Sequence, residues 1–270
     1  MSDYAGEHAE SRYEVISILA FDFASAAQWN AMTRSVRQRC LKDHRRMSFK
    51  SLGDRRRRKA LQPFLCAADS LTGICASFAI HKDVKYLCLD PKDTAKIVSD
   101  IGLQGTWNAK GLERLLRVVH FVSVLISGLS HPSQNVYWIS DQDNMFANST
   151  RCQDVTRLAS LFTRYYVQHP LGELGIGTTQ IDESDMALED MAAIPDLVAG
   201  AVAELTTQIA ATYGGRIPYG IALSVPNNIT WKAQALVDWL ASEYQHLKRP
   251  IIIFDLIETG QLRVYNFQLA

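Results

Sequence analysis

The stretch LEDMAAIPDLVAGAVAEL, Leu188–Leu205, decides the fold of this chain. Pro195 suits the first turn of a helix, where its missing N–H is not needed, so we expect a helix over about Ile194–Tyr213. Asp196 would then lie at the positive end of the helix dipole and stay ionised. The small residues after it would let this helix pack closely on a sheet. Such a carboxylate either binds a hard cation such as Mg²⁺ or only favours helix formation.

Segments typical of strands and of helices alternate along the rest of the chain. We expect strands at Tyr13–Phe23, Gly73–His81, Val84–Leu89, Asn135–Ser140, Gly172–Thr179, Pro250–Ile257 and Leu262–Phe267. We expect further helices at Ser25–His44, Asp54–Ala68, Asn108–Leu129, Ser149–Val167 and Thr230–Leu247. This alternation predicts an α/β fold, in which helices cover both faces of a sheet. The last helix and the hairpin after it would form a C-terminal extension.

The composition limits the classes of protein that the chain can represent. With 270 residues, 47% of them hydrophobic, it can build one large or two small domains. Its formal net charge is zero, so overall charge predicts no partner. The charges are unevenly distributed, however. Residues 34–59 are rich in Arg and Lys, whereas residues 165–215 contain no Lys or Arg and a series of acids. The first segment has the composition of a polyanion binder and the second that of a cation binder.

Cysteines and apolar runs predict the compartment. The five cysteines are odd in number and form no C-x-x-C pair, which favours a reducing environment over a disulfide framework. The N-terminus is polar and acidic, unlike a signal peptide. The longest apolar run, Val118–Leu129, is too short to span a bilayer. We therefore expect a cytoplasmic protein without a membrane partner.

Several kinds of site are excluded by their missing motifs. The chain has no phosphate-binding G-x-x-x-x-G-K-[ST] loop, no dinucleotide-binding glycine pattern after a strand and no G-x-S-x-G elbow. Its seven histidines include no H-E-x-x-H pair, so zinc chemistry has little support. Carboxylates are the candidates that remain.

Three groups of carboxylates lie at the expected ends of strands and helices. They are Asp3, the pair Asp141 and Asp143 after the strand NVYWIS, and the set Glu189, Asp190 and Asp196. In α/β sheets, sites form where strand ends meet helix starts, and carboxylates converging there can hold two metal ions for phosphodiester cleavage. The alternative is structural, because Asp often caps turns after strands and a chain terminus often frays.

Four short motifs resemble those of the bacterial ribonuclease-H-like proteins grouped as domain of unknown function 3800. They are Asp3-Tyr4-Ala5-Gly6, Lys50-Ser51-Leu52-Gly53-Asp54, the Asp141 that follows NVYWIS, and Asp196-Leu197-Val198-Ala199-Gly200-Ala201. The resemblance spans roughly residues 1–210. It implies a ribonuclease-H-like mixed sheet flanked by helices in residues 1–213. Residues 214–270 fall outside the resemblance, and we expect them to pack on this domain as a helix plus β-hairpin extension. It also implies a carboxylate site for Mg²⁺ or Mn²⁺ and phosphodiester chemistry.

The chain departs from this family at its first motif. The family usually has Asp-Glu-Ser-Gly on the first strand, and this chain has Asp-Tyr-Ala-Gly. Only Met1 and Ser2 precede Asp3, so either the first strand is short or the chain starts further upstream. Asp22, at the end of the next expected strand, is a fallback for the first metal ligand.

The basic segment suits a nucleic-acid partner. Phosphate contacts supply most of the sequence-independent affinity for nucleic acid, and Arg makes bidentate phosphate contacts. The candidate phosphate contacts are Lys50, Arg55, Arg56, Arg57 and Arg58. The alternative is a solvated helix face without a ligand.

Two functions therefore stay open. The first is a metal-dependent nuclease acting on RNA or DNA, in which Asp3, Asp141 and Asp196 bind the metal. Glu189 would serve as a further ligand, or Asp190 as a base that orients water. The second is a catalytically weak ribonuclease-H-like binding or assembly protein, including a subunit of a defence or toxin system. An exposed edge of the C-terminal hairpin could pair with a second copy or another protein.

Overall fold

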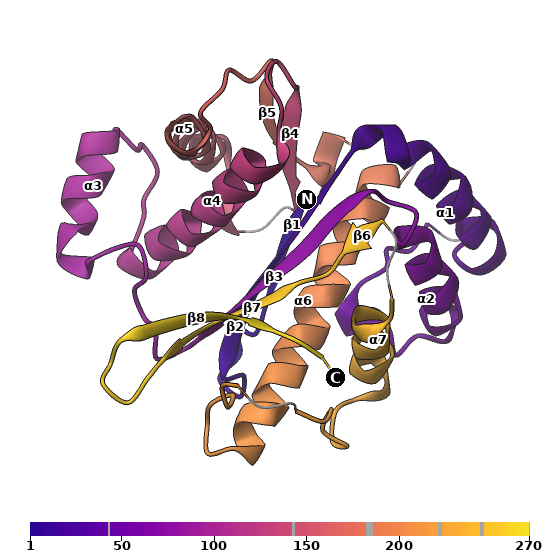
Figure 1. Ribbon diagram of the computed structural model, residues 1–270. Coiled ribbons are helices and arrows are strands. Elements are labelled where there is room, and N and C mark those ends of the chain that lie inside the picture. The colour runs from indigo at the N-terminus through magenta and orange to yellow at the C-terminus, as the bar shows by residue number, and fades with distance from the viewer. Residues whose placement is uncertain (43, 142–143, 182–185, 221–222, 244–245, 270) are drawn as a thin grey trace. The chain divides into compact units, whose positions relative to one another are not determined.

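The computed structural model describes the whole chain except residues 43, 142–143, 182–185, 221–222, 244–245 and 270 (Figure 1). Asp143, one of the candidate acids, lies outside the described residues. The chain divides into two compact units. The first consists of residues 1–84 and 182–270, and the second of residues 85–181. Each unit has its own strands and helices.

The first unit contains most of the strands. They are β1 (Ser2–Ala5), β2 (Tyr13–Phe21), β3 (Gly73–His81), β6 (Leu247–Lys248), β7 (Ile251–Leu256) and β8 (Leu262–Phe267). Its α-helices are α1 (Ala26–Cys40), α2 (Arg55–Ala68), α6 (Ala187–Thr212) and α7 (Trp231–Ala241). The short 3-10 helices η1 (Phe23–Ser25) and η2 (Phe49–Ser51) precede α1 and α2.

The strands of this unit form a mixed sheet in the order β1-β2-β3-β7-β8. Neighbouring strands are antiparallel except β3 and β7, which are parallel, and β6 adds a short parallel pairing to β3. In the register, Asp3 lies opposite Ser17, and Ser17 lies opposite Ser77. The two serine hydroxyls are 2.7 Å apart and buried. The expected α/β fold with a mixed, helix-flanked sheet is confirmed at this level, and the expected C-terminal hairpin is the β7–β8 pair.

The core lies on both sides of β2 and β3. Successive residues of β2, from Val15 to Leu19, are all buried, which marks a strand that is covered on both faces. The helix α6 packs against β1, β2 and β3 (Figure 1). It is buried on most of its circumference because nearly all of its residues after Asp190 are apolar or small. The helices α1 and α2 pack on each other, with Trp29 and Phe64 in an edge-to-face contact at 5.2 Å.

The helix α6 begins earlier than expected. It starts at Ala187, so Pro195 lies inside the helix and Asp196 lies far from its N-terminus. An internal proline costs about 3 kcal/mol in an exposed helix. Here residues 191–195 are buried, and their packing keeps the helix continuous through the proline. The expectation that the helix dipole acts on Asp196 is therefore wrong.

The second unit has two parallel strands, β4 (Val136–Ser140) and β5 (Leu174–Thr178). Its helices are η3 (Pro91–Asp93), α3 (Thr94–Ile101), α4 (Ala109–Leu129), η4 (Asn144–Phe146), α5 (Ser149–Tyr166) and η5 (Thr179–Ile181). The helices α4 and α5 pack together. Asn148 caps α5, because its side chain accepts a hydrogen bond from the N–H of Arg151.

Three further expectations are wrong in detail. Residues 84–89 form no strand, because the N–H groups of Leu87 and Cys88 donate to the buried carboxylate of Glu113 instead of to a neighbouring strand. The helix α1 ends at Cys40 rather than near His44. The helix α7 ends at Ala241, and Leu247 belongs to β6. Within the described part of the chain, no helix has both the length and the apolar character needed to cross a membrane.

Candidate functional site

Asp3 lies within β1 rather than after it. Its side chain is half-buried, and its Oδ1 accepts a hydrogen bond of 2.6 Å from the N–H of Tyr4. The fallback ligand Asp22 follows β2 and accepts a hydrogen bond of 3.0 Å from the N–H of Ala24, which caps η1. Asp22 thus has the role of an ordinary turn residue.

Asp196 connects α6 to η2. Its Oδ2 accepts a hydrogen bond of 2.8 Å from the N–H of Phe49, which begins η2. The next turn of α6 contains Gly200, where an added Cβ would lie 2.3 Å from Cγ of Phe49. This glycine therefore permits η2, and not only the sheet, to approach α6. The hydrogen bond to Asp196 and the close approach of Phe49 to Gly200 both hold η2 against α6.

The other two acids of α6 form ion pairs with the basic segment. Asp190 is buried and receives two hydrogen bonds from Arg37, one from Nε at 2.6 Å and one from Nη2 at 2.5 Å. Glu189 is half-buried, and its Oε2 lies 3.0 Å from Nε of Arg46. These carboxylates attach α1 and the segment before η2 to α6. Their expected catalytic and metal-binding roles stay predictions.

Asp141 directly follows β4 in the second unit and is half-buried. It therefore has the position after a strand that the sequence predicts. Across the described residues, we find no group of three or more His, Cys, Asp or Glu side chains arranged to hold a metal ion.

One part of the basic segment pairs with acidic or backbone groups of the first unit. We call Arg37, Arg45, Arg46 and Arg57 the inner cations. Arg37 and Arg46 pair with acids of α6. Arg45 lies 2.8 Å from Oδ2 of Asp54, and Nε of Arg57 donates to the carbonyl oxygen of Arg46 over 2.6 Å. Each inner cation therefore has a defined partner within the first unit.

The other part of the basic segment surrounds a surface hollow. This hollow has a volume of about 290 Å³. It is lined by Arg39, Cys40, Lys42, Arg56 and Lys59. We call its four charged residues the outer cations. Arg39 lies in the last turn of α1, Lys42 follows that helix, and Arg56 and Lys59 belong to the start of α2. Among the described residues, no carboxylate lines this hollow. Four cations around one concave surface attract a polyanion.

The first turn of α2 is unusually basic for its position. It begins with four consecutive arginines, Arg55–Arg58, at the helix end where cations are unfavourable. Asp54 compensates as the N-cap, because its Oδ1 accepts hydrogen bonds from the N–H groups of Arg56 and Arg57 at 3.0 and 3.1 Å. The hydrogen bond from Arg57 is the main reason that the pKa of Asp54 lies below its usual value.

Two residues of α7 that the sequence did not predict as site residues, Trp231 and Lys232, contact the basic segment and η2. The guanidinium of Arg58 lies 4.4 Å above the ring of Trp231, the first residue of α7. Lys232 lies 4.0 Å above the ring of Phe49 and donates to its carbonyl oxygen over 3.2 Å. Lys50 and Arg55 are exposed. In the sequence, only the pair Trp231-Lys232 at the start of an expected helix could have indicated these contacts.

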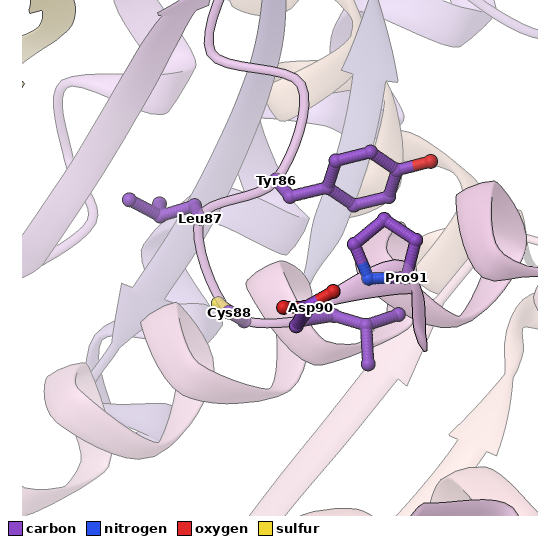
Figure 2. A pocket seen from close by; sticks show the side chains of 6 residues that line it. Tyr86, Leu87, Cys88, Asp90 and Pro91 are labelled. Carbon is purple, nitrogen blue, oxygen red and sulfur yellow. The ribbon is translucent and has the colours of Figure 1, made fainter. Parts of the chain in front are cut away.

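A second hollow lies in the second unit. It measures about 520 Å³ and is lined by one loop, residues 86–91 (Figure 2). Burial raises the pKa of the Cys88 thiol in this loop to about 12, so the thiol stays protonated at neutral pH. The side chains of Asp90 and Glu113 serve local roles, as the cap of η3 and as the acceptor for the loop N–H groups. This hollow offers no convergent reactive groups.

We compared the chain with protein-family models, curated proteins and solved structures, and no match was found in any of the three.

Proposed function

We propose that this protein binds the phosphate backbone of nucleic acid on the surface formed by α1 and α2. The observation that carries the proposal is the hollow surrounded by the outer cations Arg39, Lys42, Arg56 and Lys59. Its charge suits the phosphate groups of a polyanion, and arginine suits phosphate because its planar fork donates two parallel hydrogen bonds.

The helix start supports the same proposal. Placing Arg55–Arg58 in the first turn of α2 lowers the stability of that helix, because each cation opposes the helix dipole. Residues that break a local stability rule are expected at functional sites. Phosphate binding would explain why arginines occupy this first turn despite their cost to helix stability.

Salt dependence tests this proposal. Fluorescence anisotropy with a labelled oligonucleotide would measure affinity from 50 to 200 mM salt. We expect the logarithm of the affinity to fall with the logarithm of the salt concentration, with a slope of about 0.9 per neutralised phosphate for duplex DNA and about 0.7 for a single strand. The double variant Arg56→Gln with Lys59→Gln should reduce the slope by about 2. The matched control is Arg164→Gln, an exposed arginine on α5, which should leave the slope unchanged. A wild-type protein that binds no oligonucleotide at 50 mM salt would refute the proposal.

A second candidate is metal-dependent phosphodiester cleavage in a ribonuclease-H-like fold, with Asp3, Asp141 and Asp196 holding Mg²⁺ or Mn²⁺. One observation favours it: β1, which contains Asp3, and α6, which contains Asp196, pack against each other. The antiparallel β1-β2-β3 arrangement is also consistent with the mixed sheet that this fold requires. Glu189 and Asp190 would contribute only after release from Arg46 and Arg37.

Thermal unfolding with metal tests the second candidate. A protein that binds Mn²⁺ only in its folded state gains stability as the metal concentration rises above the dissociation constant. Asp196→Asn should abolish that gain, whereas Asp100→Asn, at an exposed position on α3, should keep it. Cleavage of labelled RNA and DNA would be measured in parallel. If oligonucleotides bind but neither metal shifts the unfolding temperature and no cleavage occurs, the protein is a catalytically weak binding or assembly protein.

A further inference from the structure

We propose that Arg58 and Trp231 form a stacking platform for an unpaired base, so that the preferred ligand of this surface is single-stranded nucleic acid. This inference rests on the proposed function, because it names the class of nucleic acid that the basic surface takes. It concerns residues outside the hollow of the outer cations.

The geometry of the pair is the first argument. Arg58 is exposed on α2, and its guanidinium lies 4.4 Å from the centre of the Trp231 ring. Trp231 is 38% exposed, although tryptophan is usually well buried. A guanidinium resting on an aromatic ring is held there by cation–π attraction. Nucleobases stack both on such guanidinium planes and on aromatic rings.

Hydrogen bonds of the residues on either side of Trp231 hold this platform in place. Trp231 is the first residue of α7, and Thr230 is the N-cap of this helix. Both the N–H and the hydroxyl of Thr230 donate hydrogen bonds to the carboxylate of Glu204 on α6, the hydroxyl over 3.0 Å. The next residue, Lys232, is fixed to the carbonyl oxygen of Phe49. A stacking surface that is already ordered loses little conformational entropy on binding.

The surrounding charges suit a strand that runs across the pair. Arg55 and Lys59 flank Arg58 on the same exposed face of α2. Proteins that bind single strands combine cations that follow the backbone with aromatic groups on which bases stack. A duplex can use the cations, but its base faces are already stacked inside the helix and cannot reach Trp231. Cations alone would bind both forms, so the platform is what discriminates between them.

The test compares Arg58→Lys with Arg55→Lys, since both substitutions keep the charge and only the first removes a planar group that lies on an aromatic ring. Anisotropy at one fixed salt concentration would measure a labelled 12-nucleotide single strand and the matching duplex. We expect the wild type to prefer the single strand. Arg58→Lys should weaken single-strand binding by about tenfold and leave duplex binding nearly unchanged. Arg55→Lys should change neither.

A second variant separates stacking from the geometry of arginine. Trp231→Leu removes the ring beneath Arg58 and should also weaken single-strand binding selectively, with the unfolding temperature recorded to confirm that the variant folds. The inference is overturned if the wild type binds duplex as tightly as single strand, or if Arg58→Lys weakens both ligands equally; in either case phosphate binding itself stands. A wild type that binds neither ligand overturns the proposed function as well as this inference.

Discussion

The inner and outer cations come from one basic stretch of sequence, yet they have opposite surroundings. Arg37 and Arg46 are paired with carboxylates of α6, and Arg37 is only 14% exposed. Lys42 and Lys59 instead line a surface hollow whose described lining residues include no carboxylate. The difference teaches that one basic stretch contains two kinds of cation: one set pairs with groups that hold the fold together, and the other lines a concave surface.

The same division explains the acids. Glu189 and Asp190 look like ligands in the sequence, but in the structure they are the partners of the inner cations. Substituting inner residues should therefore change stability, and substituting outer residues should change binding.

The largest effect is expected at the inner pair of Arg37 and Asp190. Asp190→Ala would leave the guanidinium of Arg37 largely buried without its carboxylate, and we expect the free energy of unfolding to fall by about 3–5 kcal/mol. Urea denaturation would measure this change. The double variant Arg37→Met with Asp190→Leu should lose much less, because it removes both charges together. A loss below about 1 kcal/mol in Asp190→Ala would show that the pair does not anchor α1 to α6.

A smaller effect is expected where η2 approaches α6. Gly200→Ala would place a Cβ 2.3 Å from Cγ of Phe49, so the phenylalanine must move and we expect a loss of about 1–3 kcal/mol in unfolding free energy. Gly128→Ala in α4 is the matched control, because no atom lies within 4 Å of its Cβ. The control should gain up to about 1 kcal/mol from better helix propensity. Equal effects at both glycines would argue against close packing of η2.

Much of the fold follows from periodicity in the sequence. The strands β2 and β3, the helices α2, α4 and α5, and the terminal hairpin all lie close to their expected bounds, because each has a long apolar pattern. The helix α3 was missed because it is short and none of its residues is buried. The start of α6 was missed because a rule for exposed helix ends was applied to Pro195, which is buried.

The candidate site is harder to predict from the sequence than the fold, because its contacts join residues that are far apart in the chain. The partner of Asp190 is Arg37, at a separation of 153 residues, and the partner of Asp196 is Phe49, at 147. Local patterns reveal which residues are charged but not which charges face each other across packed helices. Likewise, the Arg58–Trp231 contact joins two helices that are far apart in the chain.

An outer cation should show the reverse of Asp190. Lys42 is exposed at the rim of the hollow, so Lys42→Gln should change the unfolding free energy by no more than about 0.5 kcal/mol. Its affinity for a labelled oligonucleotide should nevertheless fall, and the logarithmic salt slope should decrease by about 1. Chemical denaturation and anisotropy on the same preparation would measure both. A variant that loses stability but keeps its affinity would place Lys42 among the inner cations.

The smallest effect concerns pH and Asp54, which contacts both sets: it pairs with the inner Arg45 and caps the helix that contains the outer Arg56. Hydrogen bonds from the backbone, chiefly that of Arg57, lower its pKa in the folded state. An acid whose pKa is lowered by folding adds stability above its unfolded pKa of about 3.9, and this contribution disappears as the pH falls through the folded value.

Asp54→Asn keeps a side chain that can cap α2 but removes the charge. The wild type should therefore be more stable than this variant near pH 6, and the difference should shrink steadily below about pH 4. Unfolding free energies measured between pH 3 and pH 6 would check this, and a difference that is constant with pH would mean that capping, not charge, is what Asp54 contributes.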